Sequence, residues 1–466
     1  MFIESIQIED LRCFRQAAVS FRHPELASPG SAALPNVTLL LGNNGAGKSS
    51  LLRAVSLAAL AAVVQSSGYV PFSMVRRSST GTASSASIRG KFKLHAQDGD
   101  GVKAPTEAPA ETLVRIVRRG TTEQISAPDA EQSSWERIYD DTSPAFLMLG
   151  YGATRRVEGS DSVDISARRK SRLLRYQRVA GLFEEHITMV PLNAWLPEWE
   201  TRNPGRYKQV INLLDRLLPE GMRFRAEREQ GQYLFEHRGV KISFGAMSDG
   251  YRQYVGWISD LLYHVCMGCP PGKKLEENRG IVLIDEIDLH LHPEWQRTVI
   301  PTMSTTLPNL QFILTSHSPI VVGTLHRENV IVFNQDSEGA SIAEPVEIEV
   351  HGLNADQVLT SRAFGLTSSR APEFVEQLKQ TSAQAQQGDE EAQRRFHKMI
   401  VYGGGADAVQ SKVEAAPPEV IEAARRLSSI QRAAVLQPRV RRPAKKKPAA
   451  TKKSARKKKR SARKKR

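Results

Sequence analysis

Two carboxylates stand side by side in the stretch IVLIDEIDLHLHPEW, residues 281–295. Its side chains that could do chemistry are Asp285, Glu286, Asp288, His290 and His292. Asp, Glu and His all bind metal ions, but histidines two residues apart do not share a helical face, which argues against zinc. The apolar run IVLI instead predicts a buried parallel strand that ends at the two adjacent acids.

A glycine-rich loop near the N-terminus indicates what those acids would meet. GNNGAGKSS fits the phosphate-loop pattern G-x-x-x-x-G-K-[ST], follows an apolar strand and opens a predicted helix. Its residues are Gly42, Asn43, Asn44, Gly45, Ala46, Gly47, Lys48, Ser49 and Ser50. Backbone N–H groups of such a loop surround phosphate oxygens at a helix N-terminus. We therefore expect Lys48 to bridge the β- and γ-phosphates of ATP and the Ser49 hydroxyl to bind Mg²⁺.

The phosphate loop suggests roles for the two adjacent acids and for one histidine. Ligands of open α/β sheets bind where the strands end, so the acids are expected beside the phosphates. Asp285 is expected to hold Mg²⁺, and Glu286 is expected to accept a proton from the attacking water. His317 follows the next predicted strand, QFILT, at the same edge, where it could contact the γ-phosphate.

A second loop, FGAMSDGYRQ, leads into a predicted helix that begins near Ser248, Asp249 and Gly250. One interpretation is an ordinary helix with a serine cap. The other is a second anion site, in which the Ser248 hydroxyl and backbone N–H groups meet a phosphate.

The order of these motifs resembles the ABC-type ATPase heads of the RecF, SMC and OLD-nuclease group. More narrowly, SDGYR, LIDEIDLHLHPEWQ and FILTSHSPIVV resemble the PtuA-type ATPases of Septu and retron-associated anti-phage systems. The resemblance implies ATP and Mg²⁺ as cofactors and heads that pair head to tail, as a homodimer or a higher homo-oligomer. It places Lys48, Ser49, Asp285, Glu286 and His317 in cis, places Ser248 and Gly250 in trans, and implies a separate HNH-type nuclease subunit.

Two departures from the family pattern set limits on the resemblance, and two further motifs are not expected to carry chemistry. The family's Leu-Ser-Gly-Gly-Gln signature is altered here at Met247, Asp249 and Tyr251, and YGATRR (151–156) stands where a glutamine loop is expected. Residues 318–466 contain no Asp-x-Asp, so no TOPRIM-type nuclease centre is expected in this chain. The lone CMGC pair, Cys266 and Cys269, is expected to consist of core cysteines rather than metal ligands.

Strands interleaved with helices predict an α/β fold with a mainly parallel central sheet. We expect an ATPase head at residues 1–340, which contains a β-rich flap at 66–145 and a helical lobe at 160–240 with two strand-like runs at its end. A helical C-terminal region is expected at 341–436 and a disordered Lys/Arg-rich tail at 437–466.

The charge of the chain is concentrated at its C-terminal end. The net charge is +15, but 17 of the 65 Lys and Arg residues lie in residues 439–466, which leaves 48 against 50 acids elsewhere. This tail is expected to bind nucleic acid. The apolar stretch 54–64 is too short to span a membrane, and three cysteines suit a reducing compartment, so a cytoplasmic location without membrane contact is expected.

The combined hypothesis is an ATP-hydrolysing switch that controls a partner nuclease in a bacterial anti-phage complex. One alternative is a RecF-like DNA-binding or repair ATPase clamp with no nuclease partner. The other is a nucleotide-binding scaffold that hardly hydrolyses ATP.

Deletion of residues 439–466 should sharply weaken DNA or RNA binding at low salt and leave basal ATPase activity and dimerisation intact. If roughly eight of its cations meet duplex phosphates, log K should fall against log salt with a slope near −7. Base sequence should matter little, because a flexible tail does not hold base edges in fixed geometry. Fluorescence anisotropy over a salt series measures both quantities. An unchanged affinity and slope would move the contact to the folded body.

Overall fold

The computed structural model describes residues 1–26, 30–78, 81–95, 98, 110–127, 147–156, 174–362 and 364–402. The chain divides into two compact units, of which the first is Met1–Ser369 and the second begins at Arg370. The expected basic tail, and the expected helical region beyond residue 402, lie outside the described residues.

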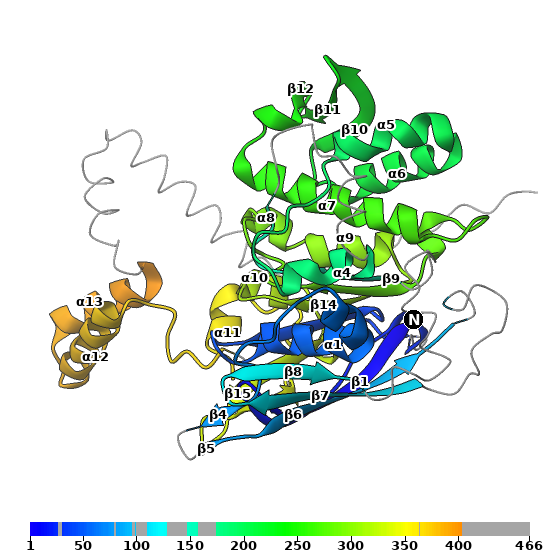
Figure 1. Cartoon of the computed structure of the whole chain (residues 1–466). Coiled ribbons are helices and arrows are strands. Elements are labelled where there is room, and N and C mark those ends of the chain that lie inside the picture. The colour runs from blue at the N-terminus through cyan, green and yellow to red at the C-terminus, as the bar shows by residue number, and fades with distance from the viewer. Residues whose placement is uncertain are drawn as a thin grey trace, which may run out of the picture. The chain divides into compact units, whose positions relative to one another are not determined.

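A six-stranded sheet forms the centre of the first unit, in the order β16-β15-β3-β14-β13-β9 (Figure 1). Its strands are β3 (Val37–Gly42), β9 (Leu147–Tyr151), β13 (Gly280–Ile284), β14 (Leu310–Thr315), β15 (Val330–Gln335) and β16 (Ser341–Pro345). All neighbours pair in parallel except β16, which runs antiparallel to β15 at the edge. The α/β fold with a mainly parallel central sheet is therefore confirmed.

Helices cover both faces of this sheet, which is why its strands are continuous apolar runs. Leu39 and Leu41 of β3 pack into a core with α6 (Pro204–Leu217), α7 (Asp249–Gly268) and α9 (Val299–Thr306), whereas Leu40 packs into a second core with α1 (Lys48–Ser66). Among the described helices, α1 is the one long and apolar enough to cross a membrane, and 72% of its apolar window is buried in this core.

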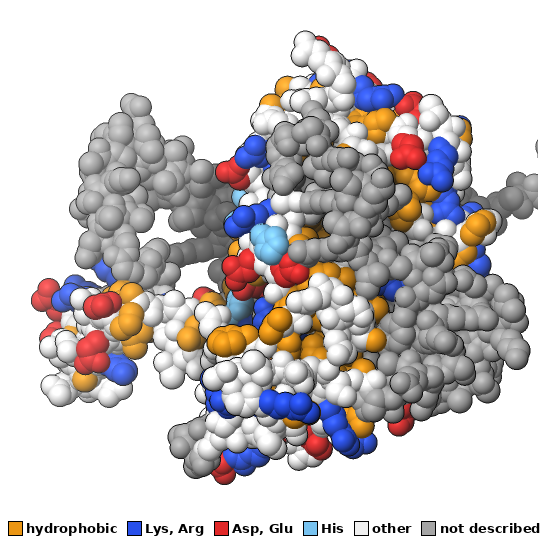
Figure 2. Space-filling model, in the orientation of Figure 1, with side chains coloured by type: hydrophobic (Ala, Val, Ile, Leu, Met, Phe, Trp, Pro, Cys, Tyr) orange, Lys and Arg blue, Asp and Glu red, His pale blue; other side chains and the backbone are white. Residues whose placement is uncertain are grey.

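A five-stranded antiparallel sheet lies on the other side of α1, in the order β2-β1-β6-β7-β8 (Figure 1). Its strands are β1 (Phe2–Leu11), β2 (Phe14–Ser20), β6 (Ser85–Lys93), β7 (Ala110–Arg119) and β8 (Thr122–Ser126). The short strands β4 (Arg77–Ser78) and β5 (Gly81–Thr82) pair with each other. The strands β4 to β8 all lie within residues 66–145, the stretch in which a β-rich flap was expected. Figure 2 shows several Lys and Arg side chains on the lower part of this view, where Figure 1 draws β4–β8.

Residues 174–243 combine helices with a small sheet. The helices α4 (Leu174–Val179), α5 (Leu192–Arg202) and α6 precede an antiparallel sheet of β10 (Met222–Glu229), β11 (Gln232–His237) and β12 (Val240–Ser243). The two strand-like runs expected at the end of the helical lobe correspond to β10 and β11 of this sheet. The strand β12 was not expected, because its alternating run VKIS is only four residues long and none of these residues is buried.

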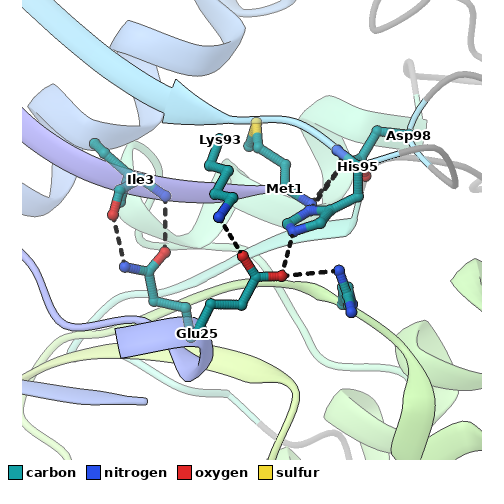
Figure 3. A network of polar contacts seen from close by, with 8 residues as sticks. Met1, Ile3, Glu25, Lys93, His95 and Asp98 are labelled. Atoms are coloured by element: carbon teal, nitrogen blue, oxygen red, sulfur yellow. Dashed lines mark hydrogen bonds and ion pairs between the residues drawn. The ribbon is translucent and has the colours of Figure 1, made fainter. Parts of the chain in front are cut away.

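A network of polar contacts joins β1 to the central sheet (Figure 3). The Gln311 side chain of β14 accepts a hydrogen bond from Ile3 N–H and donates one to Ile3 C=O, each at 2.8 Å. Nearby, Glu25 accepts from Lys93 at 2.6 Å and lies 2.9 Å from His95 Nε2. Burial alone would raise the pKa of Glu25, but the hydrogen bonds from Lys93 and His95 outweigh it and lower that pKa to about 2.

The remaining elements follow the central strands. The first unit contains α8 (Pro293–Gln296), α10 (Pro319–Val322) and α11 (Ala355–Leu359), and it continues beyond residue 340 through β16. Residues 341–345 are extended rather than helical because β16 pairs along the free edge of β15. The second unit contains α12 (Pro372–Gln386) and α13 (Glu390–Tyr402).

Candidate nucleotide-binding site

The glycine-rich loop connects the end of β3 to the first turn of α1. Gly42 is the last residue of β3 and Lys48 is the first residue of α1. The loop side chains differ in exposure: Asn43, Asn44 and Gly45 are exposed, Gly47 and Ser49 are half-buried, and Ala46, Lys48 and Ser50 are buried. The structure therefore presents the first half of the loop to solvent, at the N-terminus of a helix of 19 residues.

Gly47 is required by both its conformation and its surroundings. Its φ is +98°, in the left-handed region that side chains disfavour. A Cβ at this position would lie 2.5 Å from the Phe14 ring and 2.6 Å from Cys13 Sγ. The loop can therefore turn into α1 only with glycine here.

Lys48 lies across the loop that contains it. Its Nζ donates hydrogen bonds to Gly42 C=O at 2.8 Å and to Asn43 C=O at 3.1 Å. Burial lowers the pKa of Lys48, and the nearby carboxylates of Asp285 and Glu286 partly oppose that shift. The ammonium group is thus held at the loop, close to the acids that follow β13.

The two adjacent acids are held by one side chain of the neighbouring strand. The Thr315 hydroxyl donates to Asp285 Oδ1 at 2.6 Å and accepts from Glu286 N–H at 2.7 Å. The backbone C=O of Thr315 accepts from Ile287 N–H at 2.9 Å. Asp285 is 8% exposed, so its carboxylate is largely shielded from water. Thr315 therefore determines where both acids lie.

Glu286 occupies a strained turn. Its φ is +51°, which is uncommon for a residue with a long side chain. Its backbone C=O accepts from Leu289 N–H at 3.0 Å and from Arg155 Nη2 at 2.5 Å. The chain reverses immediately after β13, which leaves the Glu286 side chain half-buried at the edge of the sheet.

His317 joins this group from the end of β14. Burial lowers the pKa of His317, and the positive charge of Lys48 lowers it further, against the attraction of Asp288, Glu286 and Asp285. The lowered pKa favours the neutral imidazole, in which one ring nitrogen can donate and the other can accept. Because β3, β14 and β13 are adjacent parallel strands, Lys48, His317 and the acids all follow strands that end at the same edge of the sheet, as expected from the sequence.

The Ser-x-Gly loop lies at the start of α7. Ser248 occupies the N-cap position of α7, but its hydroxyl makes no capping hydrogen bond. The interpretation of this loop as an ordinary serine-capped helix is therefore right about where the helix begins and wrong about the cap. Ser248 and Asp249 are exposed. A Cβ at Gly250 would lie 2.9 Å from His290 C=O, so this loop packs against the acid-containing loop of the same chain. The role of Ser248 and Gly250 in trans, and nucleotide contact by Asp249, stay predictions.

The histidines and cysteines considered for metal binding have other surroundings. His292 is the N-cap of α8 and its Nδ1 accepts from Glu294 N–H at 3.3 Å, while His290 is exposed with a φ of +65°. Cys266 and Cys269 are buried, and burial raises the pKa of the Cys266 thiol to about 12. Neither pair is arranged as a ligand set in the described part of the chain, where three such groups converge only at His326, Glu328 and Glu349.

Two residues of the site, Thr315 and Arg155, were not singled out from the sequence. Thr315 and Arg155 both contact the acid pair, and Asp288 has a buried Oδ1 without a hydrogen-bond partner among the described residues. Thr315 is the last residue of β14, and its type and position in the sequence do not distinguish it from other strand-end hydroxyl residues. Nothing in YGATRR distinguishes Arg155, which is buried, from Arg156, which is exposed.

A family model described as "AAA domain, putative AbiEii toxin, Type IV TA system" matches residues 37–323. The chain belongs to this family. The match begins at the first residue of β3 and ends directly after α10, so it includes the phosphate loop, the Ser-x-Gly loop, the paired acids and His317.

Curated relatives of this AAA-domain protein have Septu and retron names. Septu protein PtuA of Bacillus mycoides (strain KBAB4) is 26% identical over 367 residues, which are 78% of this chain and 45% of that protein. Retron Vc95 probable ATPase of Vibrio cholerae serotype O1 biovar El Tor is 36% identical over 121 residues, 26% of this chain and 23% of that protein. Retron Ec83 probable ATPase of Escherichia coli is 31% identical over 150 residues, 32% of this chain and 28% of that protein. The chain spans less than half the length of each of these relatives.

Among solved structures, the SMC head domain from Thermotoga maritima has a TM-score of 0.42 and 15% identity, and covers 75% of this chain and 100% of that chain. A score of this size is too low to argue from, so the description of the fold rests on the strand order. The resemblance to PtuA-type and retron-associated ATPases is confirmed.

Replacement of Thr315 by Val, a side chain of nearly the same volume, should destabilise the AAA domain. The loss of the hydroxyl leaves Asp285 Oδ1 and Glu286 N–H without this partner, at about 1–3 kcal/mol for each unpaired group. Thr315→Ser keeps the hydroxyl and is the matched control. Urea unfolding measures both variants, and a Val variant as stable as the wild type would show that these hydrogen bonds do not hold the acid pair.

Proposed function

We propose that this AAA-domain protein is an ATP-binding and ATP-hydrolysing switch subunit, which pairs head to tail and controls a partner nuclease in a bacterial anti-phage defence complex. The observation that carries the proposal is the convergence of Lys48, Asp285, Glu286 and His317 at one edge of a parallel sheet. A phosphate loop and an acid pair at the same edge are the parts that nucleoside triphosphate hydrolysis requires.

The donor set fits a nucleotide with Mg²⁺. Magnesium prefers oxygen ligands, which the Ser49 hydroxyl and the Asp285 carboxylate offer. Asp288 Oδ1 is a further buried oxygen without a hydrogen-bond partner among the described residues, as a hydrated cation would require. Bound Mg²⁺ would supply positive charge against the phosphate oxygens. Lys48 would exchange its bonds to Gly42 and Asn43 for bonds to those oxygens.

Glu286 and His317 would act on the attacking water and the γ-phosphate. Glu286 follows Asp285 directly, and its backbone is held at both N–H and C=O, so its carboxylate can accept a proton at a defined place. The neutral His317 imidazole can donate a hydrogen bond to a phosphate oxygen without leaving a second cation beside Lys48.

Head-to-tail pairing is supported by the Ser-x-Gly loop. The Ser248 hydroxyl is exposed and makes no capping bond, at the N-terminus of a helix of 20 residues. Such a terminus attracts phosphate through its free N–H groups. We propose that this loop meets the γ-phosphate bound by the partner head, in a homodimer or a larger homo-oligomer.

The partner and the setting are proposed from the relatives. Their names, Septu protein and retron ATPase, support a defence complex in which a separate HNH-type nuclease is the output. The basic tail, residues 439–466, supports contact with nucleic acid and equally favours the alternative of a RecF-like DNA-binding or repair clamp without a nuclease. Purification of the full chain with co-eluting proteins, identified by mass spectrometry, separates these two functions.

Glu286→Gln should retain ATP binding and lower hydrolysis by roughly 10²–10⁴-fold, since the amide cannot accept the proton. A more persistent ATP-bound dimer should accompany the loss. Steady-state phosphate release and nucleotide titration measure the two effects. Glu294→Gln, at an exposed position of α8, is the matched control and should hydrolyse ATP normally. Near-normal turnover by Glu286→Gln would remove this residue from the mechanism.

Lys48→Ala and Ser248→Arg chains should each be inactive alone but regain activity when mixed, because a mixed dimer contains up to one intact composite site. The matched control is a Ser20→Arg chain, which carries the same substitution at an exposed position of β2 and should hydrolyse ATP without a second variant. Phosphate release by mixed and separate chains tests the pairing. Hydrolysis by isolated monomers would contradict the head-to-tail model.

A further inference from the structure

The segment that follows β9 is tightly fixed in the fold. A Cβ at Gly152 would lie 2.2 Å from Gly181 C=O, so only glycine allows this approach. Three residues later, Arg155 N–H donates to Ala153 C=O at 3.1 Å, and Met189 N–H donates to Arg156 C=O at 3.0 Å. The backbone of Arg155 is therefore held on both sides.

The Arg155 side chain reaches the backbone of the proposed general base. Its Nη2 donates to Glu286 C=O at 2.5 Å. Glu286 has a φ of +51°, a conformation that persists only where surrounding contacts impose it. Thr315 holds the N–H of the same residue, so Arg155 provides the opposing contact that completes the hold on this strained turn.

Burial and charge distinguish Arg155 from a surface arginine. It is 9% exposed, and burial lowers its pKa to about 10 even though Asp285, Asp288 and Glu286 favour the charged form. Its Nη1 has no hydrogen-bond partner among the described residues. A cation kept in such a place, with a donor to spare, is under-satisfied for a purely structural contact.

Arg155 also contacts the helix that carries the Ser-x-Gly loop. Its guanidinium carbon lies 5.9 Å from the centre of the Trp257 ring on α7. Tyr151, at the end of β9, donates from its hydroxyl to Asp260 of α7 at 2.8 Å. The segment 151–155 therefore touches the acid loop on one side and α7 on the other. Residues of all three elements, among them Arg155, Arg252 and His290, line an open cavity of about 640 Å³.

We infer that Arg155 is a positioning residue, which holds the Glu286 peptide in its strained turn and links the position of that peptide to α7. The link to hydrolysis rests on the proposed function, whereas the hold on the turn does not. A change at Glu286 would displace the guanidinium, and its packing against Trp257 would carry the displacement to the helix that begins after Ser248.

Hydrogen–deuterium exchange of the full-length protein without nucleotide tests the hold itself. In Arg155→Met, amides of the peptide 284–292 should exchange faster than in the wild type, because the Leu289 N–H shares its acceptor with Arg155. Arg156→Met, the exposed neighbour, is the matched control and should exchange like the wild type. Arg155→Lys keeps the cation, loses the fork of donors and should be intermediate, and it replaces the Met variant if that variant does not fold. Wild-type exchange in both Arg155 variants would overturn the inference.

Steady-state hydrolysis tests the link to the chemistry. Arg155→Ala should lower kcat by about 10²-fold, the effect of a small misplacement of a catalytic group, with KM for ATP changed little. Millimolar guanidinium should restore part of kcat in this variant and not in Arg156→Ala. Equal losses in kcat and in ATP binding without rescue would show a structural role and overturn the link. Absence of hydrolysis by the wild type would defeat the proposed function, and the exchange measurement would still decide the hold on Glu286.

Discussion

The hydroxyl of Thr315 is the contact on which the chemistry of this edge depends. It belongs to β14, yet it orients two acids that follow β13, and it can do so only because Ile284 and Leu314 are paired in the parallel register. A slip of one residue would turn every side chain of a strand to its other face. The two apolar cores set the register of β13 and β14, and this register determines where the two carboxylates lie.

The site places two cations among three carboxylates before any nucleotide arrives. Lys48 and Arg155 are buried cations beside Asp285, Glu286 and Asp288, and each is bonded to backbone carbonyls rather than paired directly with an acid. Carbonyl partners can be exchanged for phosphate oxygens without leaving an unpaired acid behind. The hydrogen bonds of Lys48 to the loop therefore remain available for exchange, whereas the bond of Arg155 holds the Glu286 peptide.

Sequence patterns predicted the parts of the fold and site that follow from chain-local rules. The phosphate loop, the acid pair and His317 were placed at one edge because parallel strands end together. Thr315 and Arg155 were not predicted, because neither a hydroxyl at a strand end nor one of two adjacent arginines has a recognisable spacing. Only the packing of the folded chain determines that Arg155 is buried and Arg156 is exposed. Ser248 was expected to cap its helix, but capping depends on a rotamer. The strands β12 and β16 are short and half-exposed, so tertiary pairing alone defines them.

The strand order has a consequence for how this chain emerges from the ribosome. The strand β3, which ends in the phosphate loop, lies between β14 and β15, whose residues are made about 270 positions later. During synthesis the apolar segment VTLLLG therefore has neither neighbour for most of translation. An unpaired apolar strand is prone to association with other chains. Growing chains should thus need shielding until residue 335 has left the exit tunnel, and translation speed over the last third of the head becomes a determinant of yield.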